Sequence, residues 1–169
     1  MESVFNQTWV SERLQEVLKR CGSDADGLEA SFLGSEASYM RVAETSIIQA
    51  SDITRGRVSI RAVLGRRSAR ASTTDLSATG LKRCADRAIL NARETPPGEH
   101  ELSLPQPVAL EKSEDALDPA TRALDSTTKQ NWLAPALAAH SADGLALAGR
   151  FHTGTATFAV QSTTGVHAF

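Results

Sequence analysis

The histidines and their acidic neighbours are the residues whose types could hold a catalytic metal. A helical H-E-x-x-H motif places two imidazoles on one face of a helix and a glutamate beside the metal-bound water. Only His100-Glu101 begins such a motif, and Leu104 stands where the second histidine is required, in a stretch too rich in proline to be helical. His152 and His167 could meet across two strands, but ordinary surface or packing positions are favoured for them. The sequence therefore predicts no catalytic residue and no metal ligand in this chain.

Other catalytic and cofactor-binding patterns are missing as well. The sequence has no G-x-S-x-G, no Cys–His frame, no G-x-G-x-x-G and no Walker loop. Cys21 and Cys84 are far apart and fall on the apolar stripes of two predicted helices, so they are expected to be buried free thiols. No cofactor is predicted for the chain itself.

Arginine is concentrated in one predicted β-hairpin, and this is the charged feature that stands out. A ribbon of cations could grip phosphates in a salt-dependent manner. The cluster could instead be a solvated sheet face, balanced by acids such as Asp52, Asp75 and Asp86, or a charged subunit contact. Aromatic residues that could stack on bases do not interleave with it, so nucleic acid is disfavoured. The predicted partner or peptide contacts are Arg57, Arg61, Arg66, Arg67 and Arg70.

The elements that carry these residues begin with a helix and continue with strands. Apolar residues from Val10 to Cys21 recur at helical spacing, and Gly22 is expected to supply a left-handed stop. Four strands are expected from Leu28 to Ala71, the first ended by Gly34, with an irregular stretch at 47–53. Residues 57–64 alternate polar and apolar and pair with 68–72 through a turn at 65–67.

The second half alternates helices and strands. A helix with caps at 73–77 runs to about Arg93, and a proline-rich connector follows. Asp118-Pro119 predicts a short helix, and a capping box of Thr127 and Gln130 predicts a long one that ends at 143–144. Strands are expected at 145–150, 155–161 and 166–169. The order predicts an α+β fold, in which three main helices pack on an antiparallel or mixed sheet.

Composition restricts the class of protein. With 169 residues and 41% hydrophobic residues the chain is long and apolar enough to bury a core. Its net charge of −2 gives no general attraction to nucleic acid or to an anionic membrane. The sequence shows neither a signal peptide nor an apolar run that could span a bilayer, so a cytoplasmic location is expected.

The stretch from Arg41 to Arg93 resembles the amino-terminal domain of the TldD/PmbA family, also called modulators of DNA gyrase. The block after the glycine turn, Ala71-Ser72-Thr73-Thr74-Asp75-Leu76-Ser77, carries the most specific part of the resemblance. It is followed by the helix that contains Ala85-Asp86-Arg87-Ala88-Ile89. The segment Gln161-Ser162-Thr163-Thr164-Gly165-Val166 is similar to strands that follow the family's long helix.

The resemblance implies one amino-terminal domain over 1–169, with a core α–β unit at 1–94, the connector at 95–117, and a helix plus strands at 118–169. Family members pair as catalytic and non-catalytic subunits of a zinc peptidase that cuts unfolded peptides. The zinc motif, H-E-x-x-x-H, lies in a carboxy-terminal domain that this chain lacks. No zinc ligand can be carried over, and the chain is expected to be inactive alone.

The resemblance therefore implies a non-catalytic domain that contributes to the substrate chamber and the interface with a partner subunit, in a dimer or through self-association. One alternative is a module whose arginine hairpin binds nucleic acid or an acidic protein. Another is a complete small protein that oligomerises through an uncovered face.

Overall fold

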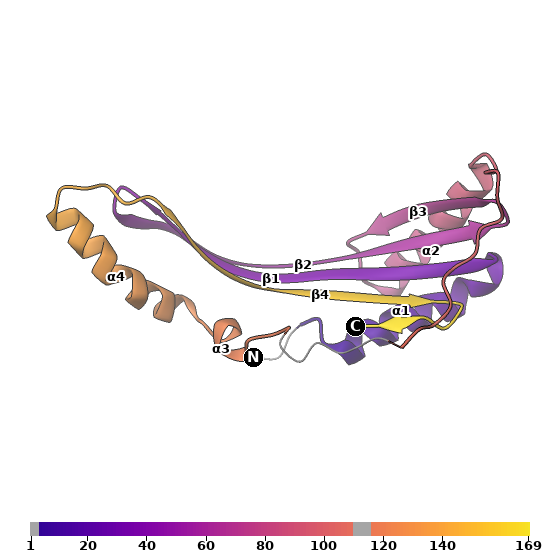
Figure 1. Ribbon diagram of the computed structural model, residues 1–169, viewed down its shortest axis with the longest axis horizontal. Coiled ribbons are helices and arrows are strands. Elements are labelled where there is room, and N and C mark those ends of the chain that lie inside the picture. Colours follow the sequence, from indigo (N-terminus) through magenta and orange to yellow (C-terminus); the bar gives the residue numbers. More distant parts are fainter. Residues whose placement is uncertain (1–3, 110–115) are drawn as a thin grey trace. The chain divides into compact units, whose positions relative to one another are not determined.

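The computed structural model describes residues 4–109 and 116–169. Within these ranges one five-stranded sheet has the strand order β3-β2-β1-β4-β5 (Figure 1). The elements, in chain order, are α1 (Gln7–Cys21), the 3-10 turn η1 (Gly22–Asp24), β1 (Gly27–Ala43), β2 (Ser46–Leu64), β3 (Arg67–Thr73), α2 (Ala78–Glu94), α3 (Pro119–Arg122), α4 (Ser126–Ala142), β4 (Gly149–Ser162) and β5 (His167–Ala168).

The sheet is antiparallel, which confirms the predicted α+β class. β2 pairs with β3 from Val58↔Thr73 to Leu64↔Arg67, and β4 pairs with β5. The chain folds as two compact units. The large unit holds 4–34, 55–109 and 157–169, and the small unit holds 35–54 and 116–156.

The two long helices of the large unit begin at side-chain caps. The Asn6 carboxamide oxygen accepts a hydrogen bond from the Trp9 amide at 2.9 Å, and the Ser77 hydroxyl accepts one from the Gly80 amide at 3.1 Å. Each cap satisfies a backbone donor that the first turn leaves unpaired. Both helices are as predicted, but Gly22 is not a left-handed stop. Its φ is −63°, and the chain continues into η1.

The core of the large unit lies between these helices and one face of the sheet. Residues at every second position of the strands reach it, which is the period expected of a sheet with one buried face. Because the side chains are almost completely buried, each large one contributes about 1.5–3 kcal/mol. The strand residues in the core are Leu28, Ala30, Phe32, Val58, Ile60, Ala62 and Ala159.

Gly34 does not end the first strand, as the sequence suggested. β1 and β2 are single long strands, so 28–73 contains three strands rather than four, and 47–53 is regular. Gly34 is required by a close contact with an aromatic side chain. A Cβ at Gly34 would lie 2.6 Å from the Phe5 ring, and a Cβ at Gly56 would lie 3.0 Å from the same ring. The aromatic ring thus packs directly on the backbone of two strands.

The proline-rich connector ties together the strand ends of the large unit. Gly98 and Leu102 donate to the carbonyls of Arg66 and Gly65, in the turn between β2 and β3. Further along, Leu104 is buried against Gly27, and the Pro105 carbonyl accepts a hydrogen bond from Thr164 at 2.6 Å. The connector is therefore extended, as its prolines predicted, and it crosses the end of the sheet.

The small unit contains the hairpin between β1 and β2. Its turn, Glu44-Thr45, has positive φ at both residues (50° and 61°), as two-residue hairpins require. The Thr45 amide and hydroxyl donate to the carbonyls of Leu147 and Leu145. These contacts hold the segment before β4. The strands predicted separately at 145–150 and 155–161 are one strand, which begins at Gly149 and ends at Ser162.

The caps of α3 and α4 are carboxylates. Asp118 caps α3 with Pro119 as its first residue, as predicted. The cap of α4 is Asp125 rather than the predicted Thr127, and the helix continues through Pro135. The apolar residues Trp132, Leu133, Ala136 and Leu137 recur at helical spacing along α4, yet Trp132 is 60% exposed and stacks on Phe151.

Candidate functional site

The β2–β3 hairpin, which carries the predicted contact residues, lies in the large unit. Gly65 adopts a left-handed φ of 56° in its turn, and its amide donates to the Asp26 carboxylate at 2.6 Å. The register Leu64↔Arg67 closes the turn tightly. Side chains at alternate positions therefore project either to the helix-covered face or to the opposite one, called here the outer face.

The structure separates the five arginines. Arg67 pairs with Leu64 on the helix side, and its guanidinium donates to the Arg93 carbonyl, near the end of α2, at 2.7 Å. A cation at this position also interacts favourably with the helix dipole, so Arg67 has a structural role. Arg66 lies in the turn, outside both strands. The outer face keeps Arg57, Arg61 and Arg70.

The counter-charge on the outer face comes from β1. Arg70 forms an ion pair with Glu29 at 3.2 Å. Neither the Arg57 nor the Arg61 side chain forms a hydrogen bond or ion pair with any residue in 4–109 or 116–169. Two of the three acids named from the sequence to balance the hairpin pair with cations of α2 instead: Asp75 with Arg83, and Asp86 with Lys82. Glu29 has no local sequence signal that would connect it to Arg70.

Apolar side chains lie on the same face. Leu33 of β1 is 47% exposed and Phe158 of β4 is 60% exposed. The Thr163 amide donates to the Leu28 carbonyl, and counting five residues along each antiparallel strand from this pair brings Phe158 opposite Leu33. The outer face therefore combines two unpaired cations with an accessible apolar pair.

A second surface is a hollow of about 500 Å³ between α1 and the β4–β5 segment. Ser11 and His167 lie 3.2 Å apart across it, and Gln161 donates to the Ser11 carbonyl. A serine–histidine pair needs a third group to orient the imidazole. No carboxylate among the described residues hydrogen-bonds His167.

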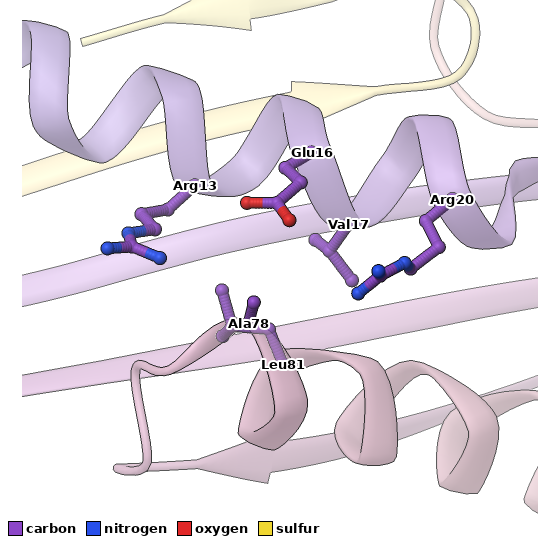
Figure 2. A pocket seen from close by; sticks show the side chains of 6 residues that line it. All are labelled: Arg13, Glu16, Val17, Arg20, Ala78 and Leu81. Carbon is purple, nitrogen blue, oxygen red and sulfur yellow. The ribbon is translucent and has the colours of Figure 1, made fainter.

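A narrow crevice between α1 and α2 is a packing seam rather than a ligand site. Figure 2 shows Arg13, Glu16, Val17 and Arg20 of α1 facing Ala78 and Leu81 at the start of α2. The crevice leaves no space for even a water-sized ligand. Arg13 also lies over the Trp9 ring, 5.6 Å from its centroid, in a cation–π contact.

The cysteines are free and buried, as predicted. Burial raises the pKa of both thiols, because the thiolate loses hydration; nearby Asp86 adds to the effect at Cys21. Burial therefore disfavours the thiolate form of both side chains. Over 4–109 and 116–169 there is no cluster of three histidine, cysteine or carboxylate side chains that could hold a metal. In the same ranges no helix is both long and apolar enough to cross a membrane.

These features define an α+β domain with an antiparallel sheet. Two helices cover one face of the sheet, and the opposite, outer face carries arginines. Residues 28–92 match the sequence family described as PmbA/TldA metallopeptidase domain 1. No curated protein matches the chain. The segment 28–92, less than half of the chain, is thus similar to the first domain of the TldD/PmbA family.

Solved structures share the fold. TldE from Thermococcus kodakarensis is 17% identical with a TM-score of 0.78, over 93% of this chain and 36% of that one. A proposed modulator of DNA gyrase from Thermotoga maritima is 13% identical with a TM-score of 0.76, over 94% and 36%. A second, from Bacteroides thetaiotaomicron, is 14% identical with a TM-score of 0.71, over 99% and 39%. This chain therefore spans little more than a third of each.

Proposed function

We propose that the chain acts as the non-catalytic amino-terminal domain of a TldD/PmbA-type peptidase subunit. In this proposal it forms part of the wall of the chamber in which unfolded peptides are cut, and part of the contact with a partner subunit. The family match over 28–92 is the observation that carries the proposal. The similar structures support it, because about two thirds of each lies outside the matched part and has room for a catalytic domain.

Within residues 4–109 and 116–169 no group of side chains fits a catalytic zinc site. The imidazole of His140 is bonded to the Ala136 carbonyl within α4, and that of His167 to Ser11. His100 lies in the extended connector, where no second ligand follows at helical spacing. Zinc, when present, would therefore be held by the catalytic domain, and this chain would contribute binding and orientation of the substrate.

The outer face is the part of the domain that the proposal assigns to contact with peptide or partner. Its sheet offers an accessible surface of fixed geometry, with cations at Arg57, Arg61 and Arg70. Arg66, in the turn, could extend the contact, whereas Arg67 is already engaged by α2. A rigid strand pair holds such groups more precisely than a loop does.

Proteolysis by the parent complex tests the proposal. Cleavage of an unstructured, internally quenched peptide would be measured for the intact subunit with its partner and for a subunit that lacks this domain. Loss of cleavage and of co-purification of the partner is the expected result. A shortened subunit that still assembles and cleaves at the original rate would contradict both assigned roles.

A further inference from the structure

The outer face of the large unit has a cross-strand order that the fold itself does not require. Ser31 donates to the Ser59 carbonyl at 3.3 Å, and one Phe5 ring covers both Gly34 and Gly56. Both observations place β1 and β2 in the same register. Combined with the β2–β3 pairs, this register arranges the outer face in three rows that run across the strands.

The first row is charged, the second small and the third mixed. The charged row contains Arg70, Arg61 and Glu29. The second row contains three serines, Ser72, Ser59 and Ser31, and continues on β4 with Val160, which the same count places opposite Ser31. The third row contains Arg57, Leu33 and Phe158. Since serine side chains are short, the middle row lies between two rows of long side chains. Cations therefore stand on both sides of a strip of hydroxyl groups.

This arrangement is unfavourable for stability. Arg61 and Arg70 are direct cross-strand partners, and like charges at such positions repel because their Cβ atoms are only about 5 Å apart. Glu29 forms an ion pair with Arg70 but not with Arg61, so it offsets the repulsion only in part. The Arg70 side chain remains 56% exposed. A sheet that needed only solubility on this face could carry alternating charges. The unpaired cations therefore point to an anionic occupant.

We infer that the outer face binds an acidic stretch of unfolded polypeptide, which lies along the serine row with carboxylates directed to Arg57 on one side and Arg61 on the other. An apolar residue of the same stretch covers Leu33 and Phe158. This inference rests on the proposed function, and it names the class of substrate segment that the chamber wall selects.

Charge and shape favour a polypeptide over a nucleic acid. Glu29 lies among the arginines and would repel a continuous phosphate backbone, whereas a peptide can place carboxylates only where cations are. The accessible ring, Phe158, is beside an aliphatic side chain and has no second ring nearby on the face for base stacking. The net charge of −2 gives no long-range attraction to DNA.

Fluorescence anisotropy on the 169-residue chain tests the inference. The probe is a short labelled peptide of glutamate, aspartate, serine and glycine with one phenylalanine, and its Gln/Asn counterpart is the neutral control. We expect salt-sensitive binding of the acidic probe alone. The double variant R57Q/R61Q should bind about 2- to 30-fold more weakly, the range for two solvent-exposed ion pairs.

A double variant with the same change in net charge provides the matched control. Arg20→Gln with Arg87→Gln removes two exposed cations from α1 and α2, and it should bind the acidic probe like the original chain. Phe158→Ser should weaken binding with little effect on its salt dependence. Thermal unfolding of R57Q/R61Q should occur at an unchanged or higher temperature, because a like-charge pair has been removed.

Several outcomes would overturn the inference: no binding of the acidic probe, equal loss in the two double variants, or tighter binding of a single-stranded oligonucleotide than of the peptide. Failure here is distinguishable from failure of the proposed function. If deletion of the domain abolishes proteolysis while the acidic probe does not bind, binding of an acidic segment is contradicted and the peptidase role stands. If arginine-dependent binding is found but proteolysis does not need the domain, the peptidase role is contradicted and binding of an acidic segment stands.

Discussion

Replacement of Lys129 by methionine should stabilise the small unit. Lys129 is completely buried on α4, and its Nζ has no hydrogen-bond partner among the described residues. An ammonium group in such a position loses its hydration without a full replacement, which costs several kcal/mol. Methionine has a similar length and volume, so it can fill the same space without the charge.

The magnitude follows from two opposing effects. The Asp125 carboxylate, at the start of the same helix, is close enough for Lys129 to contribute to the lowering of its pKa, after the hydrogen bonds from Thr128. This attraction offsets part of the desolvation cost. A cation in the first turn of a helix is also disfavoured by about 0.3–1 kcal/mol. We therefore expect Lys129→Met to raise the free energy of unfolding by about 2 kcal/mol, and Tm by roughly 4–8 °C.

Urea unfolding followed by circular dichroism would measure the change, with Trp132 fluorescence as a probe in the small unit. Lys82→Met, at an exposed position on α2, is the matched control and should change stability by less than about 0.5 kcal/mol. Lys129→Ala should destabilise, since it leaves a cavity. If Lys129→Met unfolds at lower urea than the original chain, the ammonium group has a compensating partner and the reasoning is refuted.

Three further predictions concern the large unit. Gly34→Ala should cost about 1–3 kcal/mol in urea unfolding, because its Cβ would lie under 3 Å from two phenylalanine rings, whereas Gly149→Ala, with no atom within 4 Å, should cost nothing; equal effects would contradict the close packing. Hydrogen bonds from Ser77, and the Arg83 guanidinium, hold the pKa of Asp75 below its ordinary value of 3.8. The stability that Asp75 contributes is therefore complete above about pH 4 and is lost as the pH falls through the lower folded-state pKa. In the Asp75→Asn variant the free energy of unfolding should therefore fall less steeply as the pH is lowered below about 4. Cys21 and Cys84 should resist iodoacetamide at pH 8 in the native chain and react only in denaturant; rapid labelling of either would disprove its burial.

The sequence predicts those elements whose signals are local. α2 was predicted because Ser77 precedes an apolar stripe of helical period, and the β2–β3 hairpin because alternation flanks a glycine turn. The same local reasoning gave the wrong result at Gly34. A glycine in a strand pattern can mark an end or a close contact, and only the three-dimensional position of Phe5 distinguishes the two.

The candidate site could be predicted only in part for a related reason. The alternation of polar and apolar residues in β2 correctly placed Arg57 and Arg61 on one face of the sheet. The sequence did not fix how β3 pairs with β2 after the turn, so it could not show that Arg67 faces α2 and Arg70 the outer face. The partner Glu29 is on another strand, 41 residues earlier than Arg70. In α4 the residue that is buried is Lys129, for which no sequence pattern exists.

The strand order has a consequence for synthesis of the protein on the ribosome. β1 is flanked by β2, which follows it at once, and by β4. Thr163, directly after β4, hydrogen-bonds Leu28 across a separation of 135 residues. At about 5–20 residues per second, the second edge of β1 stays open for roughly 7–27 s after the strand emerges. During that interval a long nascent strand offers unpaired amides and carbonyls to neighbouring chains. Production of the intact protein should therefore depend on chaperones that bind this edge early, and slowing translation after residue 109 should increase aggregation.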